Sequence, residues 1–298
     1  MQRLARLRVH TLLLLLSLLA VLPSARAEVA VVDDAGLPLR LQIPARRIVS
    51  LAPHATEMLF AIGAGSSVVG AIDYSDFPPE ARRLPSVGSA AYFDVERIAA
   101  LRPQLVVAWG SGNNPARVQQ LRAMGIPVFT SEPRDFEAIA SNMERLGVLT
   151  GVAQAARGVA GQFRQQLRDL QARYANRPPV RVFYQIWDAP LMTLNDAHLM
   201  SQALALCGGV NIFGTLGQLA PTVGVEDVLQ LNPEAIILAS GRDETPAIRM
   251  WQRFPQMTAA RRGNLFSANP DWLTRPSPRI VQGTEAVCRA LDVARSRR

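Results

Sequence analysis

The sequence has 298 residues, a length that suggests two domains, each large enough for a core of its own. Hydrophobic residues make up 49% of it and charged residues 19%, values that exclude a disordered or fibrous chain. The formal net charge is +8, and four arginines lie in the first 27 residues. The remainder carries no lysine or arginine run, so we expect no nucleic-acid partner.

The first 27 residues have the order of a secretory signal. Three arginines precede an apolar run over residues 12–22, and small residues follow it at Ala25 and Ala27. The run is shorter than the roughly 20 apolar residues that a membrane-spanning helix requires. We therefore expect cleavage near Ala27 and export to the periplasm, with an uncleaved membrane anchor as the alternative.

The chain after the signal begins with two short strands, at residues 29–32 and 37–43, around a turn. Strands and helices then alternate, which is typical of a parallel sheet covered on both faces. In the first half we expect strands at residues 47–51, 68–72, 105–109 and 128–130, and helices at residues 56–62, 96–101 and 115–124.

A long helix is predicted from about residue 152 to 176, because apolar residues recur there at three- and four-residue steps. A helix of that length spans about 37 Å, enough to bridge two lobes; packing on one lobe only is the alternative. The residues of its apolar face are Ala156, Val159, Phe163, Leu167, Leu170 and Tyr174. The alternation then restarts, with strands at residues 181–185, 235–239 and 264–268 and helices at residues 198–206 and 277–293.

A short segment of the first half recurs in the second. Residues 95–103 (VERIAALRP) resemble residues 225–233 (VEDVLQLNP), with glutamate, leucine and proline shifted by 130 positions. Each copy leads into an expected strand. We predict two Rossmann-like α/β lobes with mainly parallel sheets, residues 28–150 and 179–298, joined by a single helix over residues 151–178. Ligands of such sheets bind outside the carboxyl ends of the strands, here in the cleft between the lobes.

The sequence carries no familiar catalytic motif. It has no Gly-x-Ser-x-Gly elbow, no phosphate-binding loop and no His-Glu-x-x-His motif. After the signal the only histidines are His54 and His198, and neither lies at metal-ligand spacing from a cysteine. We predict a binding protein with no catalytic residue, metal or cofactor. An exported enzyme that reuses the fold is the alternative of a different class.

The chain has two cysteines, Cys207 and Cys288. An isolated pair in an oxidising compartment usually forms a disulfide. Two separate buried thiols are the alternative.

Aromatic side chains lie near the ends of the expected strands. Tyr74 follows the second strand, Trp109 ends the third, Trp187 follows the strand at residues 181–185, and Tyr92 precedes the repeated segment. Aromatic faces with a few polar groups suit a large, partly apolar ligand with a polar edge; packing in the core is the alternative for any one of them. A late loop adds Asp271, Trp272, Leu273, Thr274 and Arg275.

Glu96 and Glu226 occupy equivalent places in the two repeats, each in the first turn of a helix. A carboxylate there interacts favourably with the helix dipole, which is a sufficient structural reason for both. The functional interpretation is a matched pair of surface anchors, one on each lobe, for two arginine pockets of a symmetric partner.

The order and spacing of these motifs resemble the periplasmic cobalamin-binding proteins of ABC importers (BtuF-type solute-binding proteins). The resemblance implies two α/β lobes that move little on binding. It implies that Tyr74, Trp109 and residues 271–275 contact a corrinoid, and that Cys207 pairs with Cys288. It also implies that Glu96 and Glu226 dock on arginines of the membrane permease. The segments that carry it are residues 47–53, 56–57, 74–79, 96–98, 107–109, 207–213, 271–272, 275–280 and Cys288.

The chain also departs from that family. Ala91 and Ala220 stand where family members can present tryptophan, and Tyr92 and Trp187 are near enough in sequence to compensate. His54 stands in a loop where a small residue is usual; it either fills space or approaches a bound metal centre as a ligand. We predict a monomer that captures cobalamin or a related corrinoid and delivers it to an inner-membrane ABC permease. Haem or a ferric siderophore is the alternative ligand.

Overall fold

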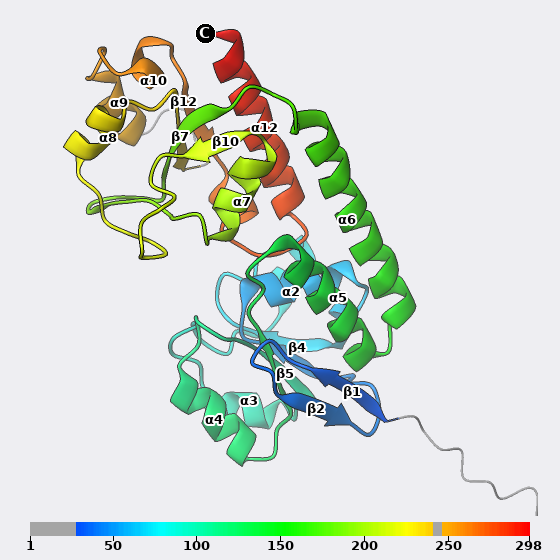
Figure 1. Ribbon diagram of the computed structural model, residues 1–298. Helices are drawn as coiled ribbons and strands as arrows, with labels where there is room; N and C mark the ends of the chain where they lie inside the picture. Colours follow the sequence, from blue (N-terminus) through cyan, green and yellow to red (C-terminus); the bar gives the residue numbers. More distant parts are fainter. Residues whose placement is uncertain (1–27, 241–245) are drawn as a thin grey trace, which may run out of the picture.

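The computed structural model describes residues 28–240 and 246–298, which fold into two α/β lobes (Figure 1). The predicted signal, residues 1–27, lies outside the described residues. The chain enters the first lobe through an antiparallel hairpin of β1 (Val29–Val32) and β2 (Pro38–Leu41). Its turn is stabilised by Asp33, whose carboxylate accepts the backbone N–H groups of Ala35 at 3.0 Å and Leu37 at 2.8 Å.

The first lobe contains a four-stranded parallel sheet in the order β4-β3-β5-β6. The strands are short runs of mostly apolar residues buried on both faces, as expected where helices cover a parallel sheet. The strands are β3 (Ile48–Ser50), β4 (Val68–Ala71), β5 (Leu105–Trp109) and β6 (Val128–Ser131). The helices are α2 (Pro53–Ala61), α3 (Val95–Ala100), α4 (Pro115–Ala123) and α5 (Phe136–Thr150), with short 3₁₀ turns at η2 (Gly65–Ser67) and η3 (Pro79–Arg83).

The second lobe repeats this plan, with a parallel sheet in the order β10-β7-β11-β12. In both lobes the first strand of the sheet lies between the second and the third. The strands are β7 (Val180–Gln185), β10 (Gly209–Asn211), β11 (Ala235–Ala239) and β12 (Leu265–Ala268), beside a small hairpin of β8 (Trp187–Asp188) and β9 (Leu191–Met192). The helices are α7 (Leu199–Leu206), α8 (Val225–Leu231), α9 (Pro246–Gln252), α10 (Thr258–Arg261), α11 (Pro270–Leu273) and α12 (Ile280–Ser296).

The shared strand order confirms the predicted fold class of two related parallel-sheet lobes. The two copies of the repeated segment form α3 and α8, and each helix leads into the third strand of its sheet, β5 or β11. The observed bounds differ from the predicted ones mostly by a few residues at the ends. Helices α5, α9, α10 and α11, the strand β10 and the hairpin of β8 and β9 were not predicted.

The long helix α6 (Ala153–Tyr174) runs along one side of both lobes (Figure 1). Its N-terminal turns, as far as Leu167, contribute Ala156, Phe163 and Leu167 to the core of the first lobe. Its last turns contribute Leu170 and Tyr174 to a core of the second lobe. The helix therefore bridges the lobes, and the alternative of packing on one lobe only is wrong.

The lobes also pack directly on each other. Leu199 of α7 and Ile280 of α12, both from the second lobe, are buried in the same apolar cluster as α2 and α5 of the first. Cys207 and Cys288 form a disulfide between the end of α7 and α12, and both are fully buried. The predicted pairing is confirmed, and α7 and α12 are covalently tied. Among residues 28–240 and 246–298 no helix is long and apolar enough to cross a membrane.

Candidate functional site

A cavity of about 400 Å³ lies between the lobes. The first lobe contributes side chains that follow the carboxyl ends of β5 and β6, which is where open α/β sheets bind ligands. The second lobe contributes the beginning of α7 and the end of α11. The lining residues are Trp109, Ser111, Glu132, Pro133 and Arg134 from the first lobe, and Ala197, His198, Leu199, Leu219, Leu273, Thr274 and Pro276 from the second.

The indole of Trp109 is held firmly at this cavity. The backbone N–H of Trp109 donates to Asn113 Oδ1 at 2.6 Å. The loop backbone at Gly112 lies so close to the ring that a Cβ there would come within 2.0 Å of the indole. On another side the imidazole of His54 meets the indole edge to face, with ring centroids 5.6 Å apart at 82°. Trp109 is therefore a fixed aromatic surface.

Polar groups lie beside this aromatic surface. Glu132 accepts the backbone N–H of Ser111 at 2.7 Å and its hydroxyl at 3.0 Å, so the carboxylate is held in one orientation. Across the cavity, His198 caps α7, and its Nδ1 accepts the backbone N–H of Met200 at 3.1 Å. The neutral imidazole then carries its proton on Nε2, and burial lowers the pKa of His198. The cavity thus combines an apolar face with a hydrogen-bond acceptor and a donor.

His54 lies behind Trp109 and is not part of the cavity lining. Its Nε2 is 3.1 Å from the hydroxyl of Ser131, which donates in turn to Asn142 Oδ1 at 2.9 Å. Because that hydroxyl proton is used, His54 donates through Nε2. Burial lowers the pKa of His54 to about 3, against a smaller opposing effect of Asp34. A neutral His54 therefore supports the aromatic wall.

This burial predicts a pH-dependent stability. Above pH 6.5 His54 is neutral in both states, whereas between pH 6.5 and about 3 only the unfolded chain takes up a proton. Stability should fall as pH falls, by up to about 1.4 kcal/mol for each pH unit. Urea unfolding at pH 8 and pH 5 should show a loss of stability that is about 2 kcal/mol smaller in His54→Gln than in the wild type. Equal losses in both proteins would contradict this. His198→Asn, which keeps a capping side chain, measures the contribution of His198 to the pH dependence of stability.

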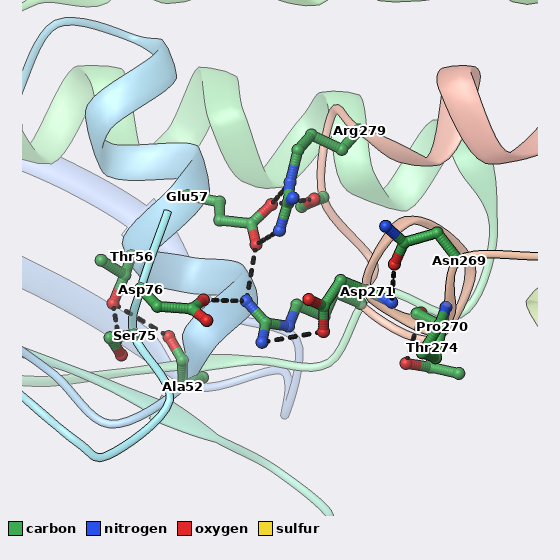
Figure 2. A network of polar contacts seen from close by, with 12 residues as sticks. Ala52, Thr56, Glu57, Ser75, Asp76, Asn269, Pro270, Asp271, Thr274 and Arg279 are labelled. Carbon is green, nitrogen blue, oxygen red and sulfur yellow. Dashed lines mark hydrogen bonds and ion pairs between the residues drawn. The ribbon is translucent and has the colours of Figure 1, made fainter. Parts of the chain in front are cut away.

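Beside the cavity, Arg275 is surrounded by carboxylates from both lobes. Figure 2 labels the three carboxylate residues, Glu57, Asp76 and Asp271. Arg275 Nη1 donates to Glu57 at 3.1 Å and to Asp76 at 2.7 Å, and its Nη2 lies 3.0 Å from Asp271. The Arg275 side chain is only 14% exposed, whereas Asp76 and Asp271 are 43% and 46% exposed. The cluster therefore presents carboxylate oxygens to solvent and keeps its guanidinium inside.

Glu57 is a residue of this region that the sequence reasoning did not single out. Its signal in the sequence is the single acidic residue of helix α2, whose other residues are apolar apart from His54 and Thr56. Such a residue faces either solvent or a buried cation, and sequence does not say which.

The other predicted aromatic residues lie outside the Trp109 cavity. Tyr74 is 80% exposed and Tyr92 76%. Tyr74 adopts a left-handed backbone conformation, φ 63°, and lines a separate hollow of about 180 Å³ with Asp73 and Asp76. Trp187 is 63% exposed and lines a third hollow of about 570 Å³ at the carboxyl ends of β7 and β11. Leu273 and Thr274 line the Trp109 cavity, and Trp272 is half-buried beside them in α11.

Glu96 and Glu226 are both exposed, in the first turns of α3 and α8 (Figure 1). Other residues cap the two helices. Asp94 accepts the backbone N–H of Arg97 at 2.9 Å, and Asp227 accepts that of Gly224 at 3.0 Å. Each lobe therefore presents a glutamate that does not carry out the capping of its helix.

Residues 48–272 match the family model described as periplasmic binding protein. The chain belongs to the periplasmic binding protein family. This is a family of solute-binding proteins and not of enzymes, and its members are periplasmic, as the sequence predicted.

Curated relatives and solved structures agree with this assignment. The vitamin B12-binding protein of Vibrio cholerae serotype O1 is 37% identical over 252 residues, which cover 84% of this chain and 91% of that protein. The crystal structure of the periplasmic vitamin B12 binding protein BtuF of Vibrio cholerae superposes with a TM-score of 0.77 at 37% identity, over 85% of this chain and 98% of that one. A periplasmic heme binding protein from Pseudomonas aeruginosa superposes with a TM-score of 0.70 at 28% identity, over 83% and 92% of the two chains.

Proposed function

We propose that this protein captures cobalamin or a related corrinoid between its lobes and delivers it, chemically unchanged, to an inner-membrane ABC permease. The observation that carries the proposal is the fixed Trp109 surface in an interlobe cavity, in a chain related over most of its length to vitamin B12-binding proteins. We further propose that cleavage falls near Ala27 and that the mature protein is a monomer with lobes at residues 28–150 and 179–298.

A corrinoid is a broad macrocycle with apolar faces and a rim of neutral carboxamide groups. Trp109 would contact a face of the macrocycle, with His54 supporting it from behind. The ligand would extend beyond the cavity, where Tyr74, Tyr92 and Trp187 are exposed for further contact. The loop with Asp271, Trp272, Leu273, Thr274 and Arg275 would receive the rim of the ligand.

The carboxylates of the Arg275 cluster, beside the cavity, favour a corrinoid over haem, whereas Arg134 in the cavity lining would attract either a carboxylate or a carboxamide oxygen. The exposed groups of the Arg275 cluster are the carboxylates of Asp76 and Asp271. A carboxamide N–H donates to such oxygens, whereas the carboxylates of haem are repelled by them. The alternative ligand, haem, is supported by the structural likeness to a heme binding protein and by exposed tyrosines that can ligate iron.

Delivery would use Glu96 and Glu226. They are exposed, occupy equivalent positions in the two lobes, and lie outside the described lining of the Trp109 cavity. A permease dimer with one arginine pocket on each subunit would match one glutamate on each lobe.

Alanine variants test the ligand site directly. Trp109→Ala should weaken cyanocobalamin binding about tenfold, because it removes a buried aromatic contact worth about 1.4 kcal/mol. Tyr74→Ala should have a smaller effect, because its side chain is largely exposed. Equilibrium dialysis measures both, and Met124→Ala, at the far end of α4, is the control. Unchanged affinity in both variants would refute this site.

A further inference from the structure

Glu57 is a buried carboxylate that collects donors from the other lobe. Its side chain is 2% exposed. Arg279 Nε donates to Oε2 at 2.8 Å, and Arg279 Nη2 donates to Oε1. The hydroxyl of Ser277 donates to Oε2 at 2.5 Å, and Arg275 Nη1 to Oε1 at 3.1 Å. Figure 2 shows the carboxylate of Glu57 facing the guanidinium of Arg279. The charge is fully compensated, but only while these partners stay in place.

The contacts of Glu57 connect segments that are distant in sequence. Glu57 belongs to α2 of the first lobe, and its donors lie 218 to 222 residues later, just before α12 of the second. The same arginines hold the loop after Tyr74: Arg275 binds Asp76, and the Arg279 guanidinium stacks on the ring of Phe77 at 4.0 Å. Separating the lobes here would leave a buried charge unpaired, which is strongly unfavourable.

Contacts within the second lobe connect the partners of Glu57 to the wall of the cavity. The Glu57 partners lead directly into α12, and Cys288 of α12 is bonded to Cys207 at the end of α7. The beginning of α7 carries His198 and Leu199, which line the cavity. Also in α7, Gln202 donates to the backbone carbonyl of Arg134 in the first lobe at 3.1 Å. The cavity residues of both lobes are therefore connected to the contacts of Glu57 through α12, the disulfide and α7.

We infer that Glu57 is a positioning residue of the ligand site: it fixes the angle between the lobes, so that the cavity has the same width with and without ligand. A cavity formed in advance lowers the ordering cost of binding. If only about a tenth of the molecules had the lobe angle that fits the ligand, the apparent affinity would fall tenfold. The expected loss of cyanocobalamin affinity rests on the proposed function. The fixed angle between the lobes in the absence of ligand does not.

Spin-label distances between the lobes test the inference. Labels at Gln119→Cys in α4 and Gln256→Cys between α9 and α10 are exposed and lie on different lobes. The native disulfide is buried and leaves no competing thiol. Without ligand, the parent protein should give one narrow distance distribution, unchanged by cyanocobalamin. Glu57→Gln should broaden it about twofold and weaken cyanocobalamin binding about tenfold. Glu234→Gln is the control, because Glu234 pairs with Arg262 and Arg298 within the second lobe, at the opposite end of α12 from Arg279.

Arg279→Lys is the second variant, and it decides the question if Glu57→Gln does not fold. It keeps the positive charge and loses the paired contact of the guanidinium with Glu57. It should therefore broaden the spin-label distance distribution less than Glu57→Gln does. A folded variant with the parent's ligand-free distribution would overturn the inference. Failure of the parent to bind cyanocobalamin would instead overturn the proposed function, and leave the ligand-free comparison of Glu57 valid.

Discussion

Replacing Glu96 and Glu226 together by alanine is expected to abolish corrinoid uptake and to leave cyanocobalamin affinity unchanged. Both side chains are exposed, and neither is among the described residues that line the cavity. Their helices are capped by Asp94 and Asp227, so the free energy of unfolding should change by no more than about 0.5 kcal/mol. Two charge-assisted contacts of about 1.5 kcal/mol each would cost docking more than a hundredfold.

The measurement is uptake of labelled cyanocobalamin through the cognate permease, with calorimetry of the purified variant beside it. Each single variant should retain part of the uptake, because one anchor remains. A matched control replaces Glu80 and Glu285, one on each lobe and both outside the repeated helices. Normal uptake by the Glu96 and Glu226 double variant would refute the docking role.

Removing the disulfide should be the most destabilising change that leaves the ligand site chemically intact. The bond joins residues separated by 81 positions. In the chain-entropy description, closing a loop of this length stabilises the folded state by about 4.5 kcal/mol. The double variant Cys207→Ala, Cys288→Ala avoids placing unsatisfied hydroxyl groups in the core, and its melting temperature should fall by about 10 °C.

Thermal unfolding with and without a reducing agent provides the comparison. Reductant should lower the melting temperature of the wild type toward that of the double variant and leave the variant unchanged. Equal melting temperatures for the two oxidised proteins would contradict a stabilising role for the bond.

Patterns repeated along the chain were predictable from the sequence. The apolar face of α6 has the helical period, and the repeat identified α3 and α8 as equivalent helices before strands of the same order. Helix α5 was missed although it begins at a capping Asp135 and ends at Gly151, where φ is 76°. A capping aspartate and a terminal glycine at this spacing predict a helix, but the apolar period of α5 is less regular than that of α6.

Contacts between distant segments were not predictable in the same way. Helix α12 starts at Ile280, three residues later than predicted, because Ser277 and Arg279 are engaged with Glu57 of the other lobe. Nothing near Glu57 in the sequence indicates partners more than 200 residues away. The aromatic residues show the same limit. The sequence places Trp109 and Tyr74 at strand ends, where the structure also has them, but the packing of the lobes decides that, of these two, Trp109 lines the interlobe cavity and Tyr74 a separate hollow.

The proposed function depends on the binding of a corrinoid in the interlobe cleft. Titration calorimetry of the mature protein with cyanocobalamin, followed by hemin under the same conditions, tests it most directly. We expect saturable binding of one cyanocobalamin per chain at micromolar or tighter affinity, and weak binding of hemin. No heat with cyanocobalamin, together with tight hemin binding and a strong Soret band, would contradict the proposed function.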